Sequence, residues 1–233
     1  MPSCRSRRKV RRVNTPRPAT PPPLSLTERR KLATQLEIAH AAAELFTAHG
    51  PDGTTAEAIA DRAGVALRTF YRYFRSKQDA VGPLLTVGGE RWRALLAASE
   101  PGAGLPDALR SAVAEALSAP DEAAAAGLRQ ARGLLRAAAD DPALRAVWYR
   151  VNQESEEKLR PVVADLAELA GGGAQPLEIR LAAAAATDAI RIALETWAES
   201  DADVTGPGSP ADLAVRCLRQ LMGGMKVLTR PEQ

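Results

Sequence analysis

Cationic and hydroxyl side chains gather in one short stretch of the chain, between residues 63 and 78, in which no acid occurs. The cations are Arg68, Arg72, Arg75 and Lys77, and threonine and tyrosine hydroxyls stand among them. Guanidinium and hydroxyl groups bind phosphate oxygens, and they bind base edges in a major groove that admits a helix. A merely solvated helix face would mix acids with bases, so we expect a polyanionic partner for this stretch.

Two short helices and a tight turn position these groups. Apolar residues recur at helical spacing over residues 56–63 and again over residues 67–74. Gly64 lies between them, where a residue without a Cβ can take the positive φ of a tight turn. Thr54 stands three residues before Glu57, a capping-box spacing that marks a helix start. The second helix keeps its apolar residues inward, and its outward side carries Arg68, Thr69, Arg72, Tyr73 and Arg75, with Tyr71 at the boundary.

The stretch resembles the DNA-binding domain of the tetracycline-repressor (TetR) family of one-component regulators, whose helix-turn-helix reads T-x-x-x-I-A-x-x-A-G-V-x-x-x-T-x-Y-x-Y-F-x-x-K. The matching positions are Thr55, Ile59, Ala60, Ala63, Gly64, Val65, Thr69, Tyr71, Tyr73, Phe74 and Lys77. Ala66 departs from the pattern, because it replaces the serine that usually caps the recognition helix with about 1 kcal/mol of stabilisation. Leu67 and Arg68 occupy variable positions that tend to set base preference, so the resemblance does not fix the operator sequence.

The resemblance implies that the partner is double-stranded DNA, with a palindromic operator read by a two-fold protein. In the family the N-terminal end of the first helix lies close to DNA, which makes cations at that end candidates for phosphate contacts. The residues expected at the DNA are Arg29, Thr54, Thr55, Ala66, Leu67, Arg68, Thr69, Tyr71, Arg72, Tyr73 and Lys77.

The composition favours an all-α protein of two domains. The 233-residue chain is 45% hydrophobic but only 4% aromatic, and no stretch alternates in the manner of a strand. No apolar run is long enough to span a bilayer, and the two cysteines, Cys4 and Cys217, belong to no metal-ligand or disulfide pattern. We therefore expect a cytoplasmic protein with no membrane partner, no metal and no cofactor.

Basic residues are concentrated at the N-terminus. Residues 1–26 carry seven cations and no acid, whereas the net charge of the whole chain is only +3. Their prolines and their scarcity of large apolar residues predict a disordered basic arm. The arm either contacts phosphates or a minor groove, or is a weakly constrained extension, and both interpretations stay open. Residues 27–80 would then form a three-helix DNA-binding domain with the helix-turn-helix, and residues 81–233 a helical ligand-binding and dimerisation domain.

Breaker residues divide the chain into about nine helices. We expect Thr27 to cap a first helix that ends near His49 and has Leu32 in its buried stripe. His40 and His49 both lie on this helix, without partners for metal binding or catalysis. A bend at residues 81–83 is expected in the fourth helix, either as a hinge or as a static kink. The helices beyond the helix-turn-helix are predicted at 78–98, 106–117, 121–139, 142–169, 177–199 and 210–228, with Asp121, Asp141 and Ser209 as caps.

Small and apolar residues mark the last two helices. Residues 181–189 are nearly all small, and the final helix has an apolar stripe of Leu213, Cys217, Leu218, Leu221, Met222 and Met225. In the TetR family the last two helices pair with their copies in a four-helix interface, which implies a homodimer. The alternative is that these faces are simply intramolecular core.

The remaining helices are expected to enclose a ligand pocket. Its candidate lining residues are Trp92, Leu96, Leu128, Leu135, Trp148, Tyr149, Asn152, Thr187 and Arg191. Arg191 would be a buried cation able to hold an acid or a phosphate. The segment 132–146 weakly resembles actinobacterial regulators of the mycofactocin type, some of which answer to fatty acyl-CoA. This resemblance suggests an acyl-CoA or another hydrophobic ligand.

These features together predict a ligand-responsive repressor that is released from DNA by a small apolar or amphipathic effector. One alternative is an effector-independent architectural or constitutive DNA-binding protein, which would have no well-formed pocket. A helical enzyme is disfavoured, because the sequence contains no nucleophile elbow, metal-ligand cluster or phosphate-binding glycine loop.

Overall fold

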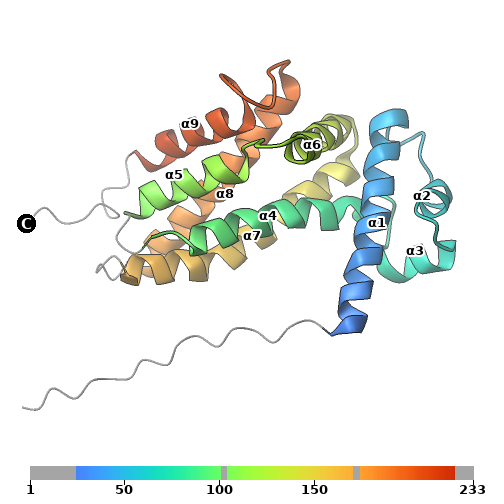
Figure 1. Cartoon of the computed structure of the whole chain (residues 1–233), viewed down its shortest axis with the longest axis horizontal. Helices are drawn as coiled ribbons and strands as arrows, with labels where there is room; N and C mark the ends of the chain where they lie inside the picture. The colour runs from blue at the N-terminus through green and yellow to red at the C-terminus, as the bar shows by residue number, and fades with distance from the viewer. Residues whose placement is uncertain (1–24, 101–103, 170–173, 224–233) are drawn as a thin grey trace, which may run out of the picture.

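The computed structural model describes residues 25–100, 104–169 and 174–223, and over these residues it consists of helices and their connections (Figure 1). This confirms the all-α fold. None of the described helices is long and apolar enough to cross a membrane. The elements are α1 (Leu26–His49), α2 (Ala56–Arg62), α3 (Leu67–Tyr73), the 3-10 turn η1 (Asp79–Val81), α4 (Gly82–Ala97), α5 (Leu105–Ala116), α6 (Glu122–Asp140), α7 (Pro142–Leu169), α8 (Pro176–Glu199) and α9 (Pro210–Met222).

Polar caps set the starts of α1 and α2. The Ser25 hydroxyl accepts a hydrogen bond from the Glu28 backbone N–H at 3.2 Å, and the Glu28 carboxylate accepts one from the Ser25 N–H at 2.8 Å. The prediction that Thr27 caps α1 was therefore wrong, because only Ser25 has a glutamate three residues later to complete the capping box. Thr55 caps α2 by accepting from the Ala58 N–H at 3.1 Å.

Two glycines with positive φ shape this N-terminal part of the molecule. Gly50 ends α1 with a φ of 71°, and Gly64 turns the chain between α2 and α3 with a φ of 67°. Residues with a Cβ rarely adopt this conformation. The structure thus contains the helix-turn-helix that was predicted around Gly64.

The core of α1–α3, which we call the head, continues into the other helices, which we call the body. Ile38 and Phe46 of α1 and Phe70 of α3 are buried in one cluster with Leu134 of α6. Leu32, expected in the buried stripe of α1, is instead 46% exposed. The reason is that the N-terminal end of α1 extends past the helices that cover its other half (Figure 1).

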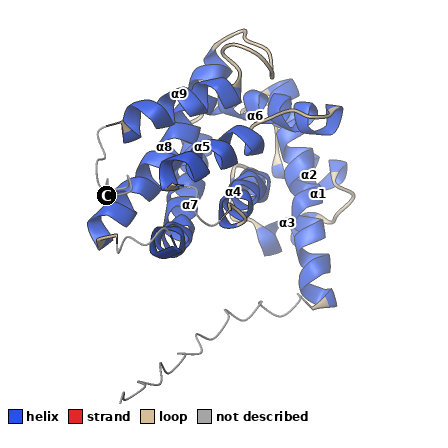
Figure 2. Cartoon of the chain, turned by 60° about the vertical axis from the view of Figure 1, so that its left-hand side comes forward, coloured by secondary structure: helices blue, strands red, loops and turns tan. Residues whose placement is uncertain are grey.

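Helices α4 to α9 pack into a second bundle with an alanine-rich core. Helix α4 lies along α7, α7 against α8, and α8 along α9 (Figures 1 and 2). Ala182, Ala186 and Ala189 of α8 are fully buried, and such small residues let neighbouring helices approach closely. Trp197, near the end of α8, is also fully buried, and its Nε1 donates to the Ala202 carbonyl at 3.0 Å.

Local sequence signals predicted most helix ends in the body. Helix α7 spans the predicted residues 142–169, and Asp121 and Ser209 cap α6 and α9. The bend expected at residues 81–83 is the junction between η1 and α4, where Pro83 occupies the first turn of α4 rather than kinking its interior. Two predicted features lie outside the described residues, the break at 171–173 and the end of the last helix at 224–228. The basic arm predicted at 1–26 lies outside them except for Ser25 and Leu26, which begin α1.

Candidate nucleic-acid interface and ligand cavity

The outward face of α3 carries basic and hydroxyl groups. Arg68, Tyr71 and Arg72 are exposed, Tyr71 by 54% of its surface. The Arg72 Nη2 donates to the Tyr73 hydroxyl at 3.1 Å, and its guanidinium carbon lies 4.8 Å from the Tyr73 ring centroid. No acidic side chain in the described part of the chain forms an ion pair with Arg68 or Arg72. The face therefore presents guanidinium groups that can bind an anionic partner.

An aromatic cluster anchors α3 to the head. Phe70 is fully buried, and its ring centroid lies 5.3 Å from that of Tyr71 and 5.6 Å from that of Phe74. Ala66 begins the helix without a side-chain cap, which confirms that the usual serine bond is missing. A helix of seven residues is unstable alone, so the packing of Phe70 must supply the stability that the cap does not.

Two of the predicted DNA contacts belong to the framework beneath this face. Thr54 is 2% exposed and its Oγ1 donates to the Gly50 carbonyl at 2.9 Å, so the capping role predicted for it was wrong and falls to Thr55. The Lys77 Nζ donates to the carbonyls of Pro51 at 2.7 Å and of Thr54 at 2.9 Å. Thr54 and Lys77 thus hold the loop before α2, whereas Thr55 is exposed at its start.

The other predicted contacts lie on or beside the exposed face. Ala66 is exposed, and Leu67, Thr69 and Tyr73 are half-buried along α3. Arg29 is exposed near the N-terminal end of α1. This end of α1 and α3 lie at the same side of the head in both views (Figures 1 and 2). The structure therefore allows one surface to include Arg29 and the outward side chains of α3.

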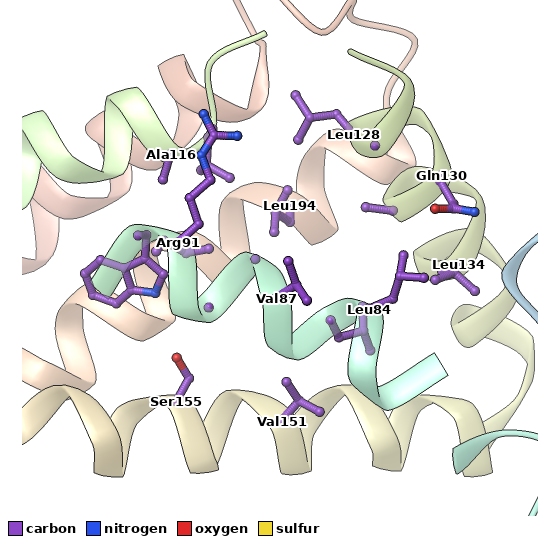
Figure 3. A pocket seen from close by; sticks show the side chains of 18 of the residues that line it. Leu84, Val87, Arg91, Ala116, Leu128, Gln130, Leu134, Val151, Ser155 and Leu194 are labelled. Atoms are coloured by element: carbon purple, nitrogen blue, oxygen red, sulfur yellow. The ribbon is translucent and has the colours of Figure 1, made fainter. Parts of the chain in front are cut away.

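A cavity of about 430 Å³ lies in the body, between α4, α6, α7 and α8 (Figure 3). Its volume falls within the roughly 300–1,000 Å³ of pockets that bind small molecules. Six of the nine residues predicted to line a pocket do line it: Trp92, Leu128, Leu135, Trp148, Asn152 and Thr187.

The other three predicted residues lie elsewhere. Leu96 is fully buried in the body core, and Tyr149 is 48% exposed on the surface of α7. Arg191 is not free to receive a ligand, because it is paired with Asp188 at 3.0 Å and with Glu195 at 2.9 Å. Burial acts to lower the pKa of Arg191, but these two carboxylates outweigh it and raise that pKa. Arg191 therefore stabilises α8 rather than the cavity.

Hydrogen bonds fix the polar part of the cavity wall. The Trp148 Nε1 donates to the Glu195 carboxylate at 2.7 Å, and the Asn152 Nδ2 donates to the Trp148 carbonyl at 2.8 Å. The Ser155 hydroxyl accepts from Arg93 at 3.3 Å, and burial lowers the pKa of this guanidinium. These bonds give the wall a defined shape before any ligand binds.

Sequence reasoning missed a large part of the lining. The head contributes Leu36 and the exposed His40 of α1, for which the sequence indicated no binding role. Helices α4 and α6 contribute further residues. Those of α6 are small and apolar and recur at helical spacing, and this spacing is the one sequence signal that could have indicated them. These missed residues include Leu84, Val87, Gly88, Arg91, Ala124, Gly127, Ala131 and Leu134.

Metal binding has no candidate in the described ranges. Among residues 25–100, 104–169 and 174–223, no three side chains of His, Cys, Asp or Glu come together in a way that could hold a metal ion.

Comparison with known families gives this geometry its context. A family model described as "Bacterial regulatory proteins, tetR family" matches residues 38–81, which run from the middle of α1 through the helix-turn-helix to η1. Over these residues the chain has the helix-turn-helix domain of the TetR family. The curated regulator TcmR of Streptomyces glaucescens, an HTH-type transcriptional regulator, is 29% identical over 150 residues, which are 63% of this chain. The match spans 66% of that relative, just under two thirds of its length.

Solved structures of two bacterial repressors have the same fold. NalD, the secondary repressor of the MexAB-OprM multidrug efflux pump in Pseudomonas aeruginosa, is 23% identical, with a TM-score of 0.53, over 88% of this chain and 100% of NalD. FadR of Thermus thermophilus, a repressor solved with lauroyl-CoA, is 24% identical, with a TM-score of 0.52, over 85% of this chain and 98% of FadR. At these identities the likeness extends to the fold alone.

Proposed function

We propose that this TetR-family protein is a homodimeric repressor that binds a palindromic operator through α3 and is released by a small apolar or amphipathic molecule. The observation that carries this proposal is the outward face of α3, with exposed Arg68, Tyr71 and Arg72 on a helix anchored by buried Phe70. A face with guanidinium and hydroxyl groups and no acid fits phosphates and base edges in a major groove. Such a repressor acts in the cytoplasm, where the chromosome lies.

Exposed apolar residues on α8 and α9 support the homodimer. Leu177 is 67% exposed, Leu181 46% and Ile192 36%, and their spacing puts all three on one side of α8. Leu221 of α9 is exposed as well, whereas Leu218 and Met222 are buried in the body core. Exposed apolar side chains grouped on one helix pair are typical of an interface that a second copy covers.

The cavity supports the release by a ligand. An effector-independent DNA-binding protein has no need of a pocket of about 430 Å³ whose walls are held by hydrogen bonds. Leu36 and His40 of α1 line it, so a bound molecule would touch the helix that carries the head. A fatty acyl-CoA is one candidate, since the related fold of Thermus thermophilus FadR is solved with lauroyl-CoA. A ligand that favours one arrangement of head and body shifts the protein toward that arrangement.

Selection of bound sequences from a random duplex library tests the proposal. The full-length protein should enrich a palindrome, and Tyr71→Ala should abolish that enrichment. Tyr149→Ala is the matched control, because Tyr149 is a tyrosine of similar exposure on α7, far along the chain from the helix-turn-helix. Enrichment of no sequence, or equal enrichment by Tyr71→Ala, would contradict the proposal. A palindrome that no ligand can displace would instead favour the effector-independent alternative.

A chain that lacks residues 1–24 tests the basic arm in the same assay. If the arm lies along phosphates, its removal should reduce the salt dependence of operator binding by about 0.9 log units for each phosphate that the arm neutralises. An unchanged salt dependence would mean that the arm does not bind DNA.

A further inference from the structure

The charges of the cavity wall are of one sign. Among the described residues that line it, Arg91 is the one arginine, no lysine is present, and neither an aspartate nor a glutamate occurs. The remaining lining is mostly leucine, valine, alanine, glycine and tryptophan, with a few neutral polar groups and His40. An apolar chamber with a single cation suits a ligand that is apolar over most of its length and anionic at one point.

Arg91 differs from most arginines of the body in having no partner in the described part of the chain. Arg93 donates to Ser155, Arg150 pairs with Asp79 at 2.9 Å, and Arg191 pairs with two carboxylates. No hydrogen bond or ion pair from Arg91 is present among the described residues. The N–H donors of its exposed guanidinium are therefore available to another molecule.

The position of Arg91 separates it from nearby acids. Its side chain rises from α4 beside Ala116 of α5, across the cavity from the apolar side chains of Leu128 and Leu194 (Figure 3). Glu90, the adjacent residue, does not line this cavity but lines a neighbouring hollow, together with Pro83. The guanidinium is thus directed to the cavity, where no carboxylate of the described chain competes for it.

We propose that the cavity selects amphiphiles with an anionic head group, which the Arg91 guanidinium binds while an apolar body lies along Leu128 and Leu194. This inference rests on the proposed function only in taking the cavity as the effector site. A carboxylate matches the planar fork of a guanidinium with two parallel hydrogen bonds. The same anchor chemistry occurs in a free fatty acid and in the phosphates of an acyl-CoA, so the test must separate these two sources.

Calorimetric titration of the full-length protein with four ten-carbon probes provides the test. The probes are decanoate, decanoyl-CoA, decanol and decylamine, with free coenzyme A as a blank for the headgroup alone. Decanoate, decanoyl-CoA or both should bind about ten-fold more tightly than decanol, as expected for one charge-assisted hydrogen-bonded pair at an exposed site, and decylamine should bind most weakly. A preference for decanoate would indicate a free acid, and a preference for decanoyl-CoA an acyl-CoA.

Two variants show whether Arg91 causes that preference. Arg91→Gln should bind the anionic probes about ten-fold more weakly and leave decanol unchanged. Arg180→Gln should match the wild type, because Arg180 is an exposed arginine on α8 that does not line the cavity. Equal affinity for decanoate and decanol, an unchanged preference in Arg91→Gln, or no binding of any probe would overturn the inference. Binding as expected without release of the operator would leave the anionic selectivity standing and contradict the repressor mechanism.

Discussion

Replacing Lys77 with methionine separates a framework role from a phosphate contact. The Lys77 ammonium donates to two carbonyls, of Pro51 at 2.7 Å and of Thr54 at 2.9 Å, on the loop between α1 and α2. A hydrogen bond with a charged partner contributes about 1.5–3 kcal/mol. Lys77→Met removes two such hydrogen bonds. Because the site is only partly buried, water replaces part of their contribution, so we expect the variant to lower the free energy of unfolding by about 2–3 kcal/mol, which is less than the sum for two bonds.

Two measurements on the same variants make the distinction. Urea unfolding gives the stability, and operator binding over a series of salt concentrations gives the number of phosphates neutralised, at about 0.9 log units each. Lys77→Met should lose stability and keep the salt dependence of the wild type. Arg68→Gln is the matched control on α3, since it should lower the salt dependence by about one phosphate and change stability by about 0.5 kcal/mol or less.

The opposite result would refute the reasoning from the structure. If Lys77→Met unfolds at the same urea concentration as the wild type and its salt dependence falls by one phosphate, the ammonium binds phosphate in solution. The two carbonyl hydrogen bonds would then contribute nothing to the framework of the loop.

Three further perturbations test other parts of the molecule. In Gly133→Ala the new Cβ would lie 2.5 Å from the Thr47 Oγ1, so urea unfolding should show a loss of about 1–2 kcal/mol that Thr47→Ala largely restores; no loss would mean that α1 and α6 approach less closely. Leu181→Asp should shift the sedimentation of the protein toward the monomer and weaken operator binding, whereas an unchanged dimer would exclude this face of α8 as the interface. Burial acts to raise the pKa of Asp141, but hydrogen bonds from Gln78 and from the backbone at the start of α7 outweigh it and lower that pKa. Its stabilisation is therefore present above the unfolded pKa near 4 and is lost as the pH falls below that value, so thermal unfolding between about pH 3 and 6 should show a smaller pH dependence in Asp141→Asn.

Features that depend on neighbours in the sequence could be predicted. The bounds of α7 follow from Asp141 and Pro142 at its start, and the caps Asp121 and Ser209 follow from side chains that reach only to the next turn. The missing cap at Ala66 could be predicted for the same reason. Errors arose where two suitable caps lie close together, as with Ser25 and Thr27, because the glutamate three residues on decides between them.

Features that depend on packing over long sequence separations could not be predicted. The lining of the cavity by Leu36 and His40 requires that α1 lie against α6 and α4, and nothing in the sequence of α1 specifies that contact. Arg191 was expected in the cavity as a buried cation able to hold an acid or a phosphate. Its pairing with Asp188 and Glu195 could have been noticed from their spacing on α8, which is three and four residues.

The packing around η1 indicates how ligand binding in the cavity would change the position of α3. Ala80 and Val81 are buried in the cluster that the head and the body share, so a hinge at this junction would break contacts on both sides of it. The cavity, by contrast, is lined by α1 itself, and Phe70 of α3 is buried in the same cluster as Ile38 of α1. A ligand shifts an equilibrium only through contacts that differ between two states, and α1 has contacts with both the cavity and the anchor of α3. We therefore expect a ligand to act on the head through the seating of α1 against α4 and α6, with the bend at residues 81–83 as a fixed joint.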